Sequence, residues 1–395
     1  MSSSVDHEAL ALSSRWQWRC TVAMHTVRSG MAACALALNF WGCGGQPLIP
    51  VTATPLAYQD HGYGNEPRTA GPKNEYLYAA HCCTLLKYGN VTVYEPLLKG
   101  LVRQITQGVL NPVAVAFDSS QTLYVTNLFY GVTEWDRGSR QPSRAIRPIY
   151  GAIGSALDAS NNLYVINCVR CIPYAHRKNV INHDSIVVFS AKRTRRSYAI
   201  NDKLFFPHAV VVDGAGYVYV ANGESAHYHA YVTVYRPHST KLWFKIENGN
   251  GVPRALALDR SGDLFIANQP SEVREYAPES RRLLRVITQG IDNPTAMLFD
   301  ESGRLYVANR GYSSSSKGWI SVYAPGALSP KYQIVEGVND PVALALDGHD
   351  DLYVANVGGR TDGKIVVYAP NGVEPVRIVK NDLFNSPVSL ALGPK

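Results

Sequence analysis

Histidine and cysteine side chains that could bind a metal lie in two neighbouring stretches of the sequence. Segment 168–184 contains two cysteines and two histidines, and segment 208–229 contains three more histidines. The five histidines are His176, His183, His208, His227 and His229. Imidazole and thiolate ligands suit Zn²⁺ and other transition metals, so a divalent metal is a candidate cofactor, with His208, His227 and His229 as candidate ligands. Cys168-x-x-Cys171 has no second regular pair, however, and histidine-rich loops are often only solvated, which is the alternative.

His208 and Arg254 occupy a position at which other copies of a repeated phrase have valine. This position follows a proline, and it is Val113, Val342 and Val388 elsewhere. A histidine and an arginine from neighbouring copies could bind a carboxylate or a phosphate through charge-assisted hydrogen bonds. Two partly exposed side chains on a loop are the alternative interpretation.

Common catalytic signatures are absent from the sequence. It contains no G-x-S-x-G elbow, H-E-x-x-H helix, P-loop or EF-hand loop. Catalytic residues therefore stay unassigned, and the sequence favours a binding protein over an enzyme.

The candidate residues are embedded in a phrase that recurs every 40 to 55 residues: a proline, an apolar run that ends in Asp, a short turn, then Leu-Tyr-Val-Ala-Asn or a close variant. Its clearest copies are PTAMLFDESGRLYVAN at 294–309 and PVALALDGHDDLYVAN at 341–356, and a degenerate copy occupies 152–167. The repeated Asp and Asn residues could be metal ligands. Their recurrence at equivalent places in six copies instead predicts structural roles in turns and at strand ends.

Each copy continues into a third strand, such as ISVYAP at 320–325, and a fourth, such as RVITQG at 285–290. Four short strands per unit at this period are typical of one blade of a β-propeller. The first strand is continuously apolar because both of its faces are covered by neighbouring blades. In the Asp-x-x-Gly turns, Gly216, Gly262 and Gly303 are expected to adopt a positive φ.

The two ends of this repeat region complete one further blade. Segment 386–393 is a first strand with nothing after it, whereas 75–81, 90–96 and 101–108 are later strands without a first one. The sequence therefore predicts an all-β fold, a seven-bladed β-propeller of four-stranded antiparallel blades, closed by pairing of the N- and C-terminal segments. A six-bladed ring is the alternative if the degenerate copy is not a blade.

The Asp turn, the Leu-Tyr-Val-Ala-Asn strand and the Val-Tyr-Ala-Pro strand resemble those of NHL-repeat and SMP-30/gluconolactonase-like propellers over residues 75–395. This resemblance implies a ligand site on the face that carries the loops between second and third strands. SMP-30-like lactonases use an acidic, metal-binding channel, and virginiamycin-B-lyase-like propellers place histidines and a metal on this face. Neither set of ligands can be matched here residue by residue.

The apolar run 31–41 and the residues around Cys43 resemble a bacterial export signal, whereas residues 1–23 do not, so Met24 or Met31 could be the true start. The apolar run 31–41 is too short to span a bilayer, and small residues flank Cys43 as at a lipoprotein cleavage site. We therefore expect a leader at 1–43 with lipidation on Cys43, a linker at 44–74 and a propeller at 75–395. A simple secretory signal is the alternative. The expected location is extracytoplasmic: periplasm, outer membrane or cell surface. In such an oxidising compartment Cys168 and Cys171 could form a local disulfide.

The composition fits this organisation. Of the 395 residues 46% are hydrophobic and 17% charged, and the net charge is +7. We expect no block of like charge to accompany this modest net charge, so nucleic acid is excluded as a partner. A membrane is expected as a partner only through the lipid anchor. The predicted function is a binding scaffold for a protein, a glycan or a small anion. The alternative is a metal-dependent hydrolase or lyase, SMP-30-like or virginiamycin-B-lyase-like, with its site at the mouth of the central channel.

Overall fold

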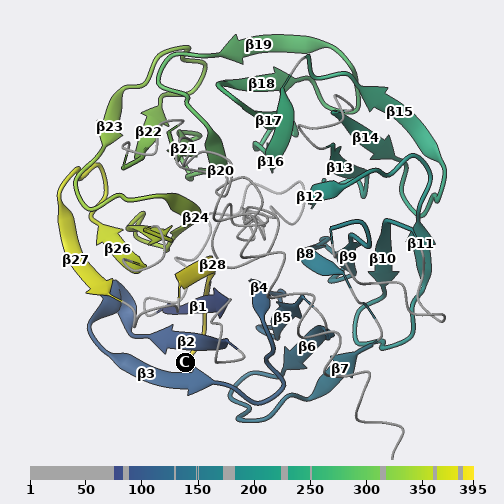
Figure 1. Cartoon of the computed structure of the whole chain (residues 1–395), viewed down its shortest axis with the longest axis horizontal. Coiled ribbons are helices and arrows are strands. Elements are labelled where there is room, and N and C mark those ends of the chain that lie inside the picture. Colours follow the sequence, from purple (N-terminus) through teal and green to yellow (C-terminus); the bar gives the residue numbers. More distant parts are fainter. Residues whose placement is uncertain are drawn as a thin grey trace, which may run out of the picture. The chain divides into compact units, whose positions relative to one another are not determined.

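The structure is a computed structural model, and its described part is a ring of seven β-sheets (Figure 1). It describes residues 75–82, 89–128, 130–147, 149, 151–171, 183–223, 230–249, 251–311, 317–358, 363–380 and 386–395. The predicted leader at 1–43, with Cys43, and the predicted linker at 44–74 lie outside these residues. Each sheet has four antiparallel strands, which confirms the predicted propeller.

We number the blades from the one that contains both ends of the repeat region, and within each blade the first strand is the innermost. Blade 1 consists of β28 (Ser386–Gly393), β1 (Tyr76–Cys82), β2 (Asn90–Tyr94) and β3 (Leu101–Ile105), with a short 3₁₀ helix η1 (Pro96–Leu98) before β3. Blade 2 consists of β4 (Pro112–Phe117), β5 (Leu123–Asn127), β6 (Gly131–Trp135) and β7 (Arg144–Ile146). Blade 3 consists of β8 (Ala152–Leu157), β9 (Leu163–Asn167), β10 (Ser185–Phe189) and β11 (Tyr198–Ile200).

The remaining blades follow in chain order. Blade 4 consists of β12 (Pro207–Val212), β13 (Val218–Asn222), β14 (Tyr231–Tyr235) and β15 (Leu242–Ile246). Blade 5 consists of β16 (Val252–Leu258), β17 (Leu264–Gln269), β18 (Glu272–Tyr276) and β19 (Leu283–Ile287). Blade 6 consists of β20 (Pro294–Phe299), β21 (Leu305–Asn309), β22 (Trp319–Tyr323) and β23 (Tyr332–Ile334). Blade 7 consists of β24 (Pro341–Leu346), β25 (Leu352–Asn356), β26 (Lys364–Tyr368) and β27 (Pro375–Lys380).

The hydrophobic core lies between neighbouring blades. Leu77 and Leu390 of blade 1, for example, pack in one cluster with Ala345 and Ile365 of blade 7. The inner strands have apolar residues on both faces because each face contacts a different blade, and β4 is buried over its whole length. This packing leaves few core positions for charged residues, which explains the low charged fraction.

Blade 1 closes the ring by pairing strands from opposite ends of the sequence. The register of β1 and β28 places Leu77 opposite Leu392 and Ala79 opposite Leu390. The Tyr78 hydroxyl also donates a hydrogen bond to the carbonyl oxygen of Pro394 at 2.7 Å. The degenerate copy at 152–167 forms the inner two strands of blade 3, so the ring has seven blades and not six.

Antiparallel order gives the ring two different faces. The connections between second and third strands, and those from one blade to the next, lie on one side, which we call the loop face. The turns between first and second strands and between third and fourth strands lie on the other side, which we call the turn face.

Within the described residues, no helix has the length and apolar character needed to cross a membrane.

Candidate functional site

The repeated aspartates organise turns on the turn face. One carboxylate oxygen of Asp213 accepts the backbone N–H groups of Ala215 and Tyr217 at 3.0 and 2.8 Å, and the other accepts the Tyr219 hydroxyl at 3.1 Å. The N–H four residues on donates to the aspartate in all six turns, at Asp118, Asp158, Asp213, Asp259, Asp300 and Asp347. The predicted positive φ is confirmed at +88°, +82° and +80° for Gly216, Gly262 and Gly303, respectively. The structural interpretation of these aspartates is therefore correct.

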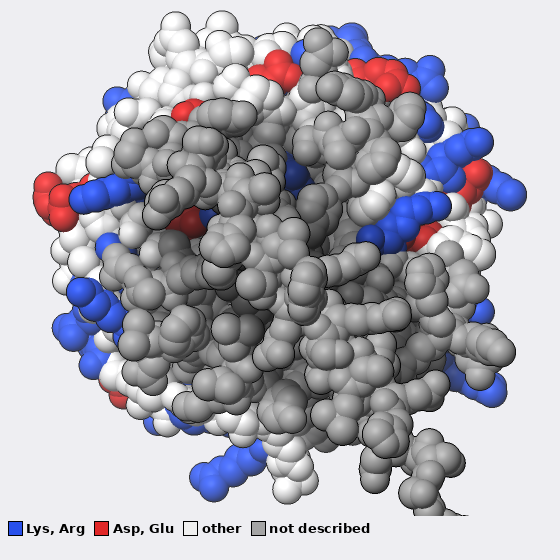
Figure 2. Space-filling model, viewed as in Figure 1, with Lys and Arg blue, Asp and Glu red and all other residues white. Residues whose placement is uncertain are grey.

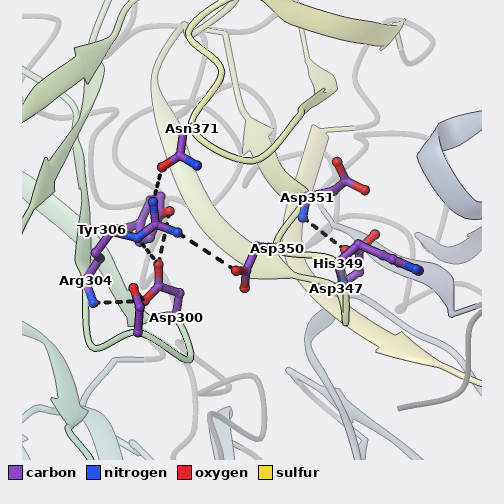
Figure 3. Close-up of polar contacts among 9 residues, drawn as sticks. Asp300, Arg304, Tyr306, Asp347, His349, Asp350, Asp351 and Asn371 are labelled. Carbon is purple, nitrogen blue, oxygen red and sulfur yellow. Dashed lines mark hydrogen bonds and ion pairs between the residues drawn. The ribbon is translucent and has the colours of Figure 1, made fainter. Parts of the chain in front are cut away.

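Two of these turns bring further charged groups together, as Figure 3 shows. Asp300 pairs with Arg304, whose guanidinium also lies 3.9 Å from the Asp350 carboxylate of the next blade. Ligand atoms of Asp347, His349 and Asp351 lie within 4.8 Å of one another. Asp347 already accepts two backbone N–H groups and a tyrosine hydroxyl, so its oxygens serve the turn. Burial and the neighbouring Asp347 carboxylate raise the pKa of Asp351 to about 6.

The repeated asparagines close the loop-face ends of the second strands. Buried Asn309 accepts the backbone N–H of Asp292 at 3.0 Å and donates to the carbonyl oxygen of Val307 and the Ser321 hydroxyl. In blade 5 this pattern changes, because Asn268 accepts a side-chain N–H from Asn248 instead. These roles again match the structural interpretation.

A β-bulge occurs in every inner strand at the residue after its first proline or equivalent residue. The strand register skips one residue there in all seven blades. The bulged residues are Val113, Ile153, His208, Arg254, Thr295, Val342 and Val388. They surround the ring axis at the loop face, since these strands are innermost in Figure 1. Blades 4 to 6 thus carry polar bulged residues, whereas the other four carry Val or Ile.

His208 and Arg254 are brought together as predicted, and the structure adds Gln269 and Asn293. Arg254 Nη1 lies 3.4 Å from His208 Nε2, and Arg254 Nε donates to Gln269 Oε1 at 2.8 Å. The Gln269 amide donates to Asn293 Oδ1, and the Asn293 amide donates to the Gly311 carbonyl oxygen at 3.3 Å. We call His208, Arg254, Gln269 and Asn293 the polar arc. It crosses the boundaries between blades 4, 5 and 6.

His208 is a neutral side chain with one unused acceptor. Its Nε2 contacts the Gly223 carbonyl oxygen, and a carbonyl oxygen only accepts, so Nε2 carries the proton. Nδ1 is then an acceptor, and it is buried without a hydrogen-bond partner among the described residues. Burial and the adjacent Arg254 charge lower the pKa of His208 to about 3, against the opposite effect of the hydrogen bond to Gly223. Arg254 is therefore the only permanent charge within the polar arc.

The other predicted site residues either lie outside the described residues or form no hydrogen bond with the polar arc. Cys168 and Cys171 form the predicted local disulfide. Within this loop Arg170 pairs with buried Asp184 at 2.9 Å, and Asp184 also accepts the backbone N–H of Phe206. His183, beside Asp184, is exposed. Residues His176, His227 and His229 lie outside the described residues, so their predicted role stays a prediction.

One expectation about charge is wrong. Residues 192–196 of the turn between β10 and β11 read Lys-Arg-Thr-Arg-Arg, and all five are exposed. This block of like charge lies on the turn face, away from the polar arc.

A hollow at the outer edge of blades 4 and 5 is likewise separate from the polar arc, and it is lined by β15 with Tyr276 and Arg281.

The described part of the chain is thus a seven-bladed β-propeller with a polar arc on its loop face. Among solved structures, it is similar to a proposed 6-phosphogluconolactonase from Bacteroides fragilis, with a TM-score of 0.61, 14% identity and coverage of 83% of this chain and 100% of that one. It is also similar to the computationally designed protein Ika8, with a TM-score of 0.55, 14% identity and coverage of 80% and 91%, respectively. At these identities the likeness shows the fold alone.

No protein-family model matches the sequence, and no curated protein matches it. The resemblance to NHL-repeat and SMP-30-like propellers is therefore confirmed only as a propeller fold, and membership of either family stays a prediction.

Proposed function

We propose that this protein is a binding protein whose polar arc takes a small anion, a carboxylate or a phosphate. The observation that carries the proposal is that the neighbours of Arg254 within the polar arc are neutral: its Nε donates to Gln269 Oε1, and its Nη1 lies 3.4 Å from His208 Nε2. Arg254 is half-buried, and Coulomb attraction is stronger in such surroundings than in bulk water. An anion at this arc would meet a guanidinium that is already oriented by Gln269 and Asn293.

The Nδ1 of His208, which has no hydrogen-bond partner within the described part of the chain, supports the same proposal. A buried acceptor without a donor costs free energy, and a ligand hydroxyl next to the anionic group would supply the missing hydrogen bond. The best fit is an anion that carries hydroxyl groups, such as a sugar acid or a sugar phosphate.

Calorimetric titration with gluconate, glucose 6-phosphate and inorganic phosphate tests this proposal. Loss of a hydrogen bond to a charged group costs about 1.5–3 kcal/mol, so we expect R254Q to weaken binding by roughly 10- to 150-fold. The matched control is R310Q on the same face, because Arg310 is ion-paired with Asp340. If R254Q binds the anions as the unaltered protein does, the proposal is wrong.

A second candidate is a hydrolase or lyase that acts on an anionic substrate at the same arc. It is favoured by the fold likeness to a protein whose name denotes a phosphorylated lactone as its substrate. The neighbouring Arg254 guanidinium opposes a divalent cation at His208, so the described residues do not fit a metal there. Turnover of lactones or esters that H208A abolishes would favour this candidate over simple binding. A stoichiometric metal by elemental analysis would contradict the argument that no metal fits at His208.

We also propose that the chain is exported and anchored through Cys43. The support is the apolar run 31–41 followed by small residues around Cys43. In a bacterial host, C43A is expected to move the protein from the membrane fraction to the soluble extracytoplasmic fraction. An unaltered protein that is already soluble would contradict lipidation.

A further inference from the structure

We propose that the turn face of blades 2 to 5 is a docking surface for an acidic polysaccharide. The surface consists of four turns between third and fourth strands, at 136–143, 190–197, 236–241 and 277–282, which we call the basic turns. Together they contain ten Lys and Arg residues and two acidic residues, a net of eight positive charges. The ten cations are Arg137, Arg140, Lys192, Arg193, Arg195, Arg196, Arg236, Lys241, Arg281 and Arg282.

The equivalent turns of the other three blades are balanced. Segments 95–100, 324–331 and 369–374 contain two lysines and two glutamates, which cancel. The net charge of the whole chain is +7, so the basic turns account for its sign.

The cations of the basic turns are available to a partner. All ten are exposed, and none forms an ion pair with a carboxylate of the described residues. Arginines elsewhere in the ring do form such pairs, for example Arg144 with Glu134 and Arg285 with Glu275. The chain therefore neutralises arginines within the blades, whereas the ten cations of the basic turns have no carboxylate partner among the described residues. Two of these cations, Arg236 and Arg281, instead lie over the rings of Trp243 and Phe244.

The ring geometry makes one continuous surface of these turns. Blades 2 to 5 are consecutive, and their outer strands follow one another around the edge of the ring in Figure 1. Figure 2 shows Lys and Arg side chains around the whole rim of the ring, on the side of blades 6, 7 and 1 as well. Neighbouring blades also touch there, since Arg281 Nε donates to the Lys245 carbonyl oxygen at 3.0 Å. An extended polymer could follow the basic turns along the rim of the ring and contact several of them at once. Such multiple contacts increase affinity even where each single contact is weak.

The chemistry of the basic turns favours carboxylate or sulfate groups on sugars. Eight of the ten cations are arginines, whose planar guanidinium binds such oxyanions in a bidentate manner. Between them stand hydroxyl side chains that can bond sugar hydroxyls, including Ser143, Thr194, Ser197 and Thr240. The hollow lined by β15, Tyr276 and Arg281 borders the last two turns and offers a concave place for a sugar unit.

Two other polyanions fit less well. Single-stranded nucleic acid needs aromatic faces for base stacking. The large aromatic rings near these turns are already covered, because Trp243 stacks on Tyr217 with centroids 5.1 Å apart and lies 4.7 Å from the Arg236 guanidinium. An anionic lipid surface is usually held by apolar anchors as well, and the basic turns contain no large hydrophobic residue.

The test is binding of fluorescently labelled polygalacturonate to the full chain at several salt concentrations. Because each contact releases counterions, we expect affinity to fall by about 10- to 100-fold between 50 and 200 mM NaCl. Each cation removed is expected to weaken binding about fivefold, so R193S/R195S and R137S/R140S should each lose roughly 25-fold. The matched control is K99S/K331S, which removes the same charge from equivalent turns that are not among the basic turns. It should change affinity less than about twofold.

Three results would overturn the proposal. The first is no binding at 20 mM NaCl. The second is an equal loss of affinity in the control K99S/K331S and in the two basic-turn variants. The third is tighter binding of an oligonucleotide or of phosphatidylglycerol vesicles than of polygalacturonate, measured by competition. If the docking surface includes the basic turn of blade 2, R137S/R140S must also weaken binding. A melting temperature equal to that of the unaltered protein shows that each variant is folded.

Discussion

Replacing His208 should remove much of the acid sensitivity of this fold. The pKa of His208 is lowered to about 3 by burial and by Arg254, whereas a histidine in the unfolded chain titrates near 6.5. The unfolded state therefore binds a proton that the folded state refuses between these pH values. The stability is present above pH 6.5 and is lost as the pH falls toward 3.

The magnitude follows from proton linkage. Between the two pKa values the free energy of unfolding falls by about 1.4 kcal/mol per pH unit. At pH 5, one and a half units below the unfolded pKa, His208 alone costs about 2 kcal/mol relative to pH 8.

The assay is urea unfolding of the unaltered protein and H208Q at pH 8 and pH 5, without added anions. The difference between the two pH values should be about 2 kcal/mol smaller in H208Q, because its amide does not titrate. Exposed His238 provides the control, and H238Q should keep the acid sensitivity of the unaltered protein. Equal acid sensitivity in H208Q and in the unaltered protein would refute the argument that His208 is neutral and buried.

Three further changes test the scaffold by urea unfolding. N309A removes the buried amide that bonds the Asp292 N–H and the Val307 carbonyl, and it should cost about 1–3 kcal/mol, whereas N201A on the exposed surface should cost less than about 0.5 kcal/mol. G131A should cost at least about 2 kcal/mol, because a Cβ there would lie 2.2 Å from the Ile146 carbonyl oxygen at a φ of +78°, and a cost near zero would contradict that contact. Deletion of 386–395 removes the inner strand of blade 1 and should abolish the single cooperative transition, and retention of that transition would argue against closure.

The repeat made the fold predictable from the sequence. Blades 2 to 7 have the same Asp turn and buried Asn, so six copies report the same local geometry. The two end segments complement each other, because one supplies the first strand of blade 1 and the other supplies its three remaining strands. The degenerate copy at 152–167 kept the residues that the blade needs, namely its Asp158 turn and buried Asn167. Consistent local signals of this kind are what make a repeat architecture legible.

The candidate site was only partly predictable. His208 and Arg254 stand out because they break a valine pattern, and equivalent positions in neighbouring blades must lie close together. Gln269 and Asn293 gave no such signal, since Gln269 ends a second strand and Asn293 precedes an inner strand. The basic turns were missed because their cations are spread over four segments between 136 and 282, and only the ring brings those segments onto one edge.

The pairing of β1 with β28 also sets a condition on how the protein can be made. Residues 76–82 pair with residues 386–393, which the ribosome adds only after all the other strands. Until then blade 1 is an unfinished three-stranded sheet. Its exposed strand β1 is then a template for wrong pairing with other nascent chains. Because the final contact joins residues more than 300 positions apart, ring closure is expected to be the slowest step of folding and the one that most needs a chaperone.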